Sequence, residues 1–226
     1  MGSIIEYLRP DGRMASGYLA EASGDSAPGV VVIQEWWGLV DQIKGVCERL
    51  AQAGYHALAP DLYGGKLVSY HNVGGAAKAM EELDFIDVVD QAARGAVQHL
   101  KTFAPAVGLT GFCMGGAITV LGALRIPELD AAVAFYGLPP EEALQMDQLR
   151  VPFQAHFAEL DDWCTPKAVD AFEQKLKQSS HVCELYRYPG VHHAFMNEQR
   201  PDAYDPQAAQ QAWQRMLDFF RQQFSV

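Results

Sequence analysis

Residues 107–115 read Val-Gly-Leu-Thr-Gly-Phe-Cys-Met-Gly, and this stretch decides the fold. Its first half is an apolar run typical of a buried strand, and its second half matches the pattern Gly-x-nucleophile-x-Gly of a sharp strand-to-helix turn. Gly111 and Gly115 would keep side chains away from the neighbouring backbone. The helix after Cys113 would direct free N–H groups at the thiol and favour the thiolate. The plainer alternative is a tight turn with a buried cysteine.

Strand and helix patterns alternate on both sides of this turn. Such repeated units predict an α/β fold, with a mostly parallel central sheet and helices on both faces. The N-terminal residues 4–20 favour one or two edge strands, and residues 63–75, with four glycines, suggest a loop or lid. Strands are expected at 29–34, 55–60, 107–110, 131–136, 153–157 and 182–188. Helices are expected at 41–53, 78–103 with a break near Asp84, 113–124, 166–178 and 206–224.

Composition narrows the classes of protein. The 226 residues are 49% apolar and 20% charged, as in a globular protein, and we expect a single domain over residues 1–226. The net charge of −11 argues against nucleic acid and anionic membranes as partners. No apolar run is long enough to span a bilayer, and residues 1–10 lack a signal-peptide pattern. We therefore expect a cytoplasmic protein, a monomer or homodimer, that binds a small-molecule substrate.

The four cysteines are Cys47, Cys113, Cys164 and Cys183. None form a Cys-x-x-Cys pair, so a zinc or redox-dithiol site is not expected. His192 and His193 are adjacent rather than four apart, which also disfavours a metal site. The sequence thus predicts free thiols and no cofactor.

Polar residues follow two later strands. Asp161 and Asp162 come after the strand at 153–157, and His192 and His193 come after the last strand. Sites in open parallel sheets lie at the carboxyl ends of strands, and the order nucleophile, acid, histidine is that of the α/β-hydrolases. A histidine can accept the thiol proton and return it to a leaving group, while an aspartate orients the imidazole. We therefore expect Cys113 to be a nucleophile.

An oxyanion hole requires two N–H donors. The backbone N–H of Met114, directly after the nucleophile, is expected to supply one. The other is expected from the loop after the strand at 29–34, whose sequence is Gln-Glu-Trp-Trp-Gly at 34–38.

The chain resembles the dienelactone hydrolase (carboxymethylenebutenolidase) family of α/β-hydrolases. The motifs are Gln-Glu-x-x-Gly at 34–38, Ala-Pro-Asp-Leu-Tyr at 59–63, Gly-Phe-Cys-Met-Gly-Gly at 111–116, Asp-x-x-x-Pro at 162–166 and His-x-Phe at 193–195. The resemblance implies Cys113 as nucleophile, Asp162 as acid and His193 as base. It also implies that Glu35 contacts the thiol and helps convert it to thiolate, and that Trp36 supplies the second oxyanion N–H.

One departure concerns the substrate. Family members that act on dienelactone bind its carboxylate with arginines, one of them four residues after the catalytic histidine, where this chain has Asn197. Arg200 is nearby but is expected to be an ordinary surface residue. A neutral ester or lactone is therefore favoured over dienelactone. Residues that would shape its pocket are Trp37, Tyr63, Tyr136, Trp163 and Asn197.

Alternative functions remain open at this point. The same site could hydrolyse activated aryl esters or phosphotriesters. It could pass an acyl group to an alcohol or thiol instead of water. A binding protein that retains the pocket without turnover is a third possibility, although the acid and the histidine that it would not need are both present.

Overall fold

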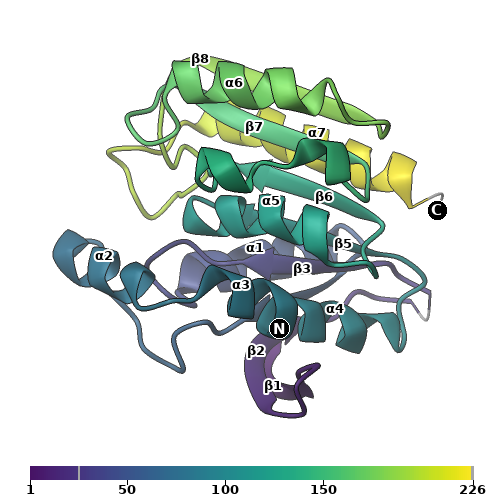
Figure 1. Cartoon of the computed structure of the whole chain (residues 1–226). Coiled ribbons are helices and arrows are strands. Elements are labelled where there is room, and N and C mark those ends of the chain that lie inside the picture. Colours follow the sequence, from purple (N-terminus) through teal and green to yellow (C-terminus); the bar gives the residue numbers. More distant parts are fainter. Residues whose placement is uncertain (25, 225–226) are drawn as a thin grey trace.

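The computed structural model describes residues 1–24 and 26–224, and it places them around one eight-stranded sheet of order β1-β2-β4-β3-β5-β6-β7-β8 (Figure 1). From β4 to β8 all neighbours are parallel, while β1 and β2 are antiparallel to each other and β2 is antiparallel to β4. The strands are β1 (Ser3–Leu8), β2 (Met14–Ala20), β3 (Gly29–Ile33), β4 (His56–Pro60), β5 (Val107–Phe112), β6 (Ala131–Phe135), β7 (Phe153–Leu160) and β8 (Cys183–His192).

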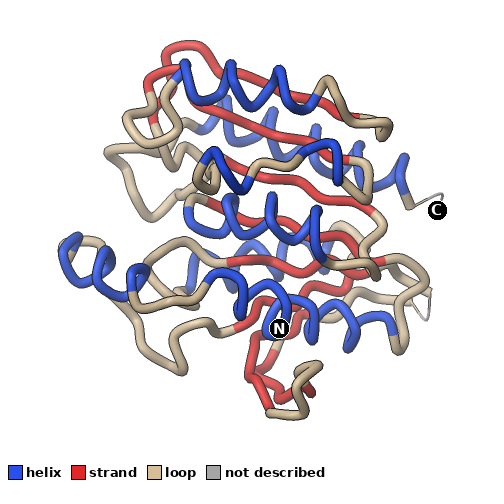
Figure 2. The backbone as a smooth tube through the Cα atoms, in the orientation of Figure 1, coloured by secondary structure: helices blue, strands red, loops and turns tan. Residues whose placement is uncertain are grey.

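Helices cover both faces of this sheet, as Figures 1 and 2 show, with α4, α5 and α6 in front and α1 and α7 behind. They are α1 (Asp41–Gln52), α2 (Val73–Glu81), α3 (Phe85–Asp87), α4 (Arg94–Lys101), α5 (Met114–Arg125), α6 (Pro166–Leu176) and α7 (Pro206–Gln223). A π-helical turn, η1 (Val88–Ala93), joins α3 to α4, and two short 3-10 turns are η2 (Glu141–Ala143) and η3 (Met146–Gln148). The predicted α/β-hydrolase architecture is confirmed.

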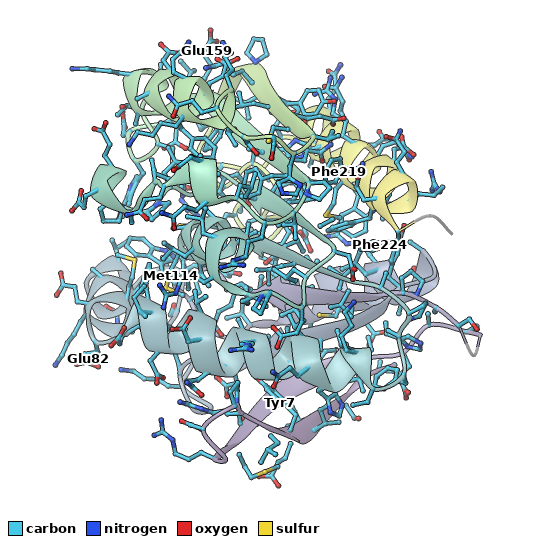
Figure 3. All side chains as sticks on the ribbon, turned by 45° about the vertical axis from the view of Figure 1, so that its right-hand side comes forward. Tyr7, Glu82, Met114, Glu159, Phe219 and Phe224 are labelled. Atoms are coloured by element: carbon cyan, nitrogen blue, oxygen red, sulfur yellow. The ribbon has the colours of Figure 1, made fainter. Side chains whose placement is uncertain are left out.

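The central strands are buried on both faces because each is sandwiched between helices. Every residue of β3, β5 and β6 is buried, which explains their continuous apolar sequence. Phe219 and Phe224, labelled in Figure 3, are buried on the α7 side. Across the part of the chain that the structure describes, no helix is long and apolar enough to cross a membrane.

The expected loop at 63–75 is shorter than predicted. Its last three residues, Val73 to Gly75, already belong to α2, because the side chain of Asn72 caps the helix by accepting a hydrogen bond from Gly75 N. The predicted break near Asp84 is confirmed, since Asp84 accepts hydrogen bonds from Ile86 N and Asp87 N and starts α3. Glu82, just beyond α2, points to solvent at the left of Figure 3.

Candidate active site

Cys113 lies on the sharp turn between β5 and α5. Its φ of 57° is in the left-handed region, which a residue with a side chain adopts only when the surroundings hold it there. A Cβ on Gly111 would collide with the carbonyl oxygen of Gly115, and one on Gly115 would collide with that of Ile33. The two glycines therefore let α5 start directly against the ends of β3 and β5, as the pattern predicted.

His193 follows β8 and is joined to an aspartate that follows β7. The Nδ1 atom of His193 lies 2.8 Å from Oδ2 of Asp161, whose side chain is fully buried. The other oxygen, Oδ1, accepts hydrogen bonds from Trp163 N at 2.8 Å and Cys164 N at 3.0 Å. Asp161 is thus held rigidly as the partner of the imidazole.

The choice of Asp162 as the acid is corrected by this contact. Asp161 opens a tight turn that points its carboxylate inward, toward His193, and leaves Asp162 exposed at the mouth of the pocket. The neighbouring His192 is also exposed and lines the same mouth, so His193 is the histidine directed inward.

Burial disfavours a charged imidazole, but the bond to Asp161 and the neighbouring Cys113 sulfur outweigh it and raise the pKa of His193 to about 10. The second ring nitrogen, Nε2, is buried and forms no hydrogen bond with any described residue. Cys113 and His193 line the same two cavities, so the thiol and the imidazole border the same space.

Glu35 follows β3 and is 1% exposed. Its Oε1 accepts a hydrogen bond from Tyr136 Oη at 3.2 Å, and its Oε2 accepts one from Asn197 Nδ2 at 2.7 Å. Burial raises the pKa of Glu35, although these two bonds and the charge of His193 oppose the shift. The expected contact with the thiol is replaced by contacts with Tyr136 and Asn197, so Glu35 sits beside Cys113 without a hydrogen bond to it.

Trp36 N and Met114 N, which the sequence predicts as oxyanion donors, lie in the loop after β3 and at the start of α5. Among the described residues, neither Trp36 N nor Met114 N donates a hydrogen bond. Tyr63 fixes this region, because its Oη donates to the carbonyl oxygen of Trp36 at 3.1 Å and lies 3.6 Å from Met114 Sδ. Tyr63 therefore supports the loop and does not line the pocket, which corrects its predicted position.

A cavity of about 390 Å³, here called the polar pocket, opens at Cys113. Trp37 and Trp163 line it as predicted, while Asn197 is buried behind it on Glu35. Tyr136 lies beneath His193, with ring centroids 5.1 Å apart. The polar pocket is bounded by Glu35, Trp36, Trp37, Tyr70, Val73, Cys113, Leu160, Asp162, Trp163, His192, His193, Ala194, Arg200, Asp202 and Ala203.

A sequence model of the dienelactone hydrolase family matches residues 15–224.

The chain belongs to the dienelactone hydrolase family.

Relatives support this assignment over nearly the full length. The chain is 38% identical to Protein usf of Aquifex pyrophilus, with 98% of this chain and 99% of that protein covered. It is 34% identical to a protein of Aquifex aeolicus, provisionally named a carboxymethylenebutenolidase, with 98% of both covered. The crystal structure of a provisionally named dienelactone hydrolase from Klebsiella pneumoniae superposes with a TM-score of 0.88 at 29% identity, covering 98% of this chain and 99% of that one. Membership confirms the expectation of a hydrolase of the dienelactone hydrolase type.

The sequence predicts Arg200 to be an ordinary surface residue, but in this dienelactone hydrolase family member it has a different position. It lines the polar pocket, with its guanidinium 6.0 Å from the ring centroid of Trp37. Its charge is paired with Asp202, at 2.7 Å between Nη2 and Oδ2. The turn at Asn197, whose N–H bonds to the carbonyl of Ala194, brings Arg200 back to the pocket, and nothing in the local sequence pattern signals this return.

Two further positions near Cys113 have φ values rare for residues with side chains. Tyr136, directly after β6, has a φ of 36°, and Ala194, directly after the histidine pair, has a φ of 64°. Tyr136 packs against the ring of His193, and Ala194 follows His193 in the sequence. Such strain is retained where packing fixes functional groups in position. Within residues 1–24 and 26–224, no cluster of three or more histidine, cysteine or carboxylate side chains could bind a metal.

Proposed function

We propose that this chain hydrolyses neutral carboxylic esters or lactones through a covalent thioester on Cys113. The observation that carries the proposal is the strained thiol beside an imidazole whose far nitrogen is bound to the buried Asp161. This arrangement is that of a nucleophile, a base and an orienting carboxylate.

In the first half-reaction, the thiol proton passes to Nε2 of His193 and the Cys113 sulfur attacks the carbonyl carbon. The N–H groups of Trp36 and Met114 receive the negative oxygen, and each such donor typically contributes about 3–4 kcal/mol to stabilising the transition state. The C–O bond to the alcohol then breaks, and His193 returns its proton to the departing oxygen. The acyl group stays on sulfur.

In the second half-reaction, Nε2 of His193 removes a proton from water, and the hydroxide attacks the thioester carbon. Collapse of this second intermediate breaks the C–S bond and releases the carboxylic acid. Asp161 stabilises the imidazolium at both steps through its bond to Nδ1. The raised pKa of His193 supports a site that stabilises the imidazolium formed at each step.

Glu35 has a positioning role in this proposal. A carboxylate beside the sulfur would oppose thiolate formation, and burial counters this by favouring the uncharged carboxyl. Its bonds to Tyr136 and Asn197 tie the loop with Trp36 to the segment after His193. Glu35 therefore holds the oxyanion loop in place without repelling the thiolate.

The substrate is proposed to be neutral because the polar pocket offers no unpaired cation among the described residues that line it. Asn197 replaces the arginine that acts in family members specific for dienelactone, and Arg200 is paired with Asp202. An acidic chain of net charge −11 also gives no long-range attraction for anions.

The test is a panel of p-nitrophenyl esters, lactones, dienelactone and an organophosphate triester. The parent protein is expected to release a burst of p-nitrophenol equal to the enzyme concentration, followed by slower turnover. Cys113→Ala should abolish both phases, and Cys113→Ser should turn over far more slowly than the parent. Cys183→Ala is the matched control, because that half-buried thiol in β8 lines neither cavity at the nucleophile, and it should retain parent activity.

Full activity in Cys113→Ala would overturn the proposal. Turnover of the triester alone would instead favour phosphotriester hydrolysis. Ester products formed with added alcohol, in place of the free acid, would assign acyl transfer.

A further inference from the structure

A second cavity, here called the apolar chamber, adjoins the nucleophile. It has a volume of about 200 Å³ and shares Cys113, Trp163 and His193 with the polar pocket. Apart from these shared residues its walls are mostly apolar, and the side chains that give it this character are Met80, Phe85, Met114, Leu138, Pro139 and Pro140. The thiol and the imidazole thus lie between two cavities of different chemistry.

The two cavities are built from different parts of the fold. The apolar chamber is formed by the end of α2, the start of α3, the first turn of α5 and the segment after β6. The polar pocket is formed by the loop after β3 and by residues 192–203, which include Arg200 and Asp202. A substrate whose reacting carbon lies at Cys113 can therefore place one substituent in each.

We propose that the apolar chamber binds the acyl group of the ester, while the polar pocket holds first the alcohol and then the attacking water. This inference rests on the proposed thioester chemistry at Cys113. It narrows the substrate class to esters with an apolar acyl portion close in size to a benzene ring.

The assignment of the two substituents follows from the second half-reaction. Water must attack from the place that the alcohol has left, since His193 protonates the departing alcohol and deprotonates the attacking water. The charged side chains of Asp162, Arg200 and Asp202 line the polar pocket, and they can form hydrogen bonds with a water molecule there. A water in the apolar chamber would lack such partners, and an ordered water needs about two to four of them.

The size of the acyl group follows from the volume. An apolar protein cavity of about 150 Å³ accommodates benzene. The 200 Å³ chamber can therefore take a phenyl ring with one or two additional carbons, whereas a long fatty acyl chain would exceed it.

The first experiment compares acetyl, butyryl, phenylacetyl and decanoyl esters of p-nitrophenol. The parent is expected to prefer phenylacetyl over acetyl by at least about tenfold in kcat/KM, since each well-buried methylene is worth roughly tenfold or more. Ala117→Leu, which places a larger side chain in the chamber, should reduce this preference about tenfold. Phe85→Ala should move the optimum toward the longer acyl groups.

The matched control is Ile86→Ala. Ile86 is adjacent to Phe85 but is 43% exposed and lies outside the chamber wall, so its acyl preference should equal that of the parent. A second substrate series keeps the acyl group constant and varies the alcohol. Neither Ala117→Leu nor Phe85→Ala should change the order of preference among alcohols.

A binding experiment separates this inference from the proposed function. Toluene is titrated into Cys113→Ala protein and followed by ligand-observed NMR, with no turnover required. Binding is expected, and adding Ala117→Leu should weaken it at least tenfold.

The results that overturn the inference are distinct. Unchanged acyl preference in both chamber variants, or a change in alcohol preference instead, would refute it even if Cys113→Ala abolishes hydrolysis. If the parent hydrolyses no ester, the proposed function fails, and toluene binding then decides whether the chamber is a site at all. Absence of toluene binding would refute the proposal that the apolar chamber is a binding site.

Discussion

Nδ1 of His193 lies 2.8 Å from Oδ2 of Asp161, although the two residues are 32 positions apart and come from the ends of different strands. The neighbouring Asp162 makes no such contact among the described residues and faces solvent. This pairing identifies Asp161 as the carboxylate that contacts the imidazole. Substituting each aspartate in turn tests which of the two acts in the reaction.

Asp161→Asn is expected to lower kcat by about 10³–10⁴-fold, because an amide cannot stabilise the imidazolium and favours the wrong tautomer. Asp162→Asn, the matched control, should lose less than about tenfold. The measurement is steady-state hydrolysis of a p-nitrophenyl ester. The reverse order of effects would show that Asp162 rearranges to become the acid when substrate binds.

The stability of the same pair should depend on pH. The folded pKa of His193 is about 10, above its ordinary value of 6.5, so folding favours the protonated ring. This contribution is complete below about pH 6.5 and is lost as the pH rises through about 10. The gap in unfolding free energy between the parent and Asp161→Asn should therefore be largest near about pH 6 and shrink toward about pH 10. Urea titrations across that range test this, and a gap that is constant with pH would contradict it.

Glu35→Gln should become more stable relative to the parent as the pH rises from about 4 to 7. Burial raises the pKa of Glu35, so an uncharged Glu35 side chain stabilises the folded protein relative to a charged one. That advantage is present below the unfolded value of about 4.3 and is lost as the pH rises toward the folded pKa. A glutamine does not ionise, and it can accept from Asn197 and donate to Tyr136.

Thermal unfolding at several pH values measures this difference for Glu35→Gln. The midpoint of the variant should exceed that of the parent by a few degrees at pH 7, with little difference near pH 4. A lower midpoint for the variant at pH 7 would show that the carboxylate is ionised and well paired in the folded protein.

Tyr63→Phe should lower kcat about two- to tenfold and leave KM nearly unchanged. The substitution removes one neutral hydrogen bond, from Tyr63 Oη to the Trp36 carbonyl, whose net contribution is about 0.5–1.5 kcal/mol. The loss falls on the transition state because the loop positions the Trp36 N–H. Tyr55→Phe is the control, since its hydroxyl bonds to Leu217 on α7. Equal kcat in the two variants would argue against a role for the loop.

Much of the fold was predictable because its signals are local. The glycines around Cys113 and the continuous apolar strands result from steric and burial requirements that act over a few residues. The choice of His193 over His192 also agrees with the inward direction of its ring. The cap at Asn72 was harder to see, because glycines at 74 and 75 favour a loop by propensity while the cap favours a helix.

The prediction of Asp162 in place of Asp161 is wrong because two features of β7 decide which of these neighbours points inward. β7 continues to Leu160 instead of ending near residue 157, and its pairing with β8 shifts register between Ala158 and Leu160. A one-residue slip reverses the direction of every later side chain. The position of Arg200 in the pocket is not predictable for a related reason. The turn at Asn197 that brings it there depends on long-range packing around Glu35.

The close approaches of Gly111 to Gly115 and of Gly115 to Ile33 have an evolutionary consequence. Any larger residue at these positions must push apart two strands and a helix, so the backbone around Cys113 tolerates almost no variation. Cys113 itself differs from serine by a single atom, and it lines two cavities. Mutation can therefore exchange the reactive element at little structural cost, whereas the frame that presents it must be inherited unchanged.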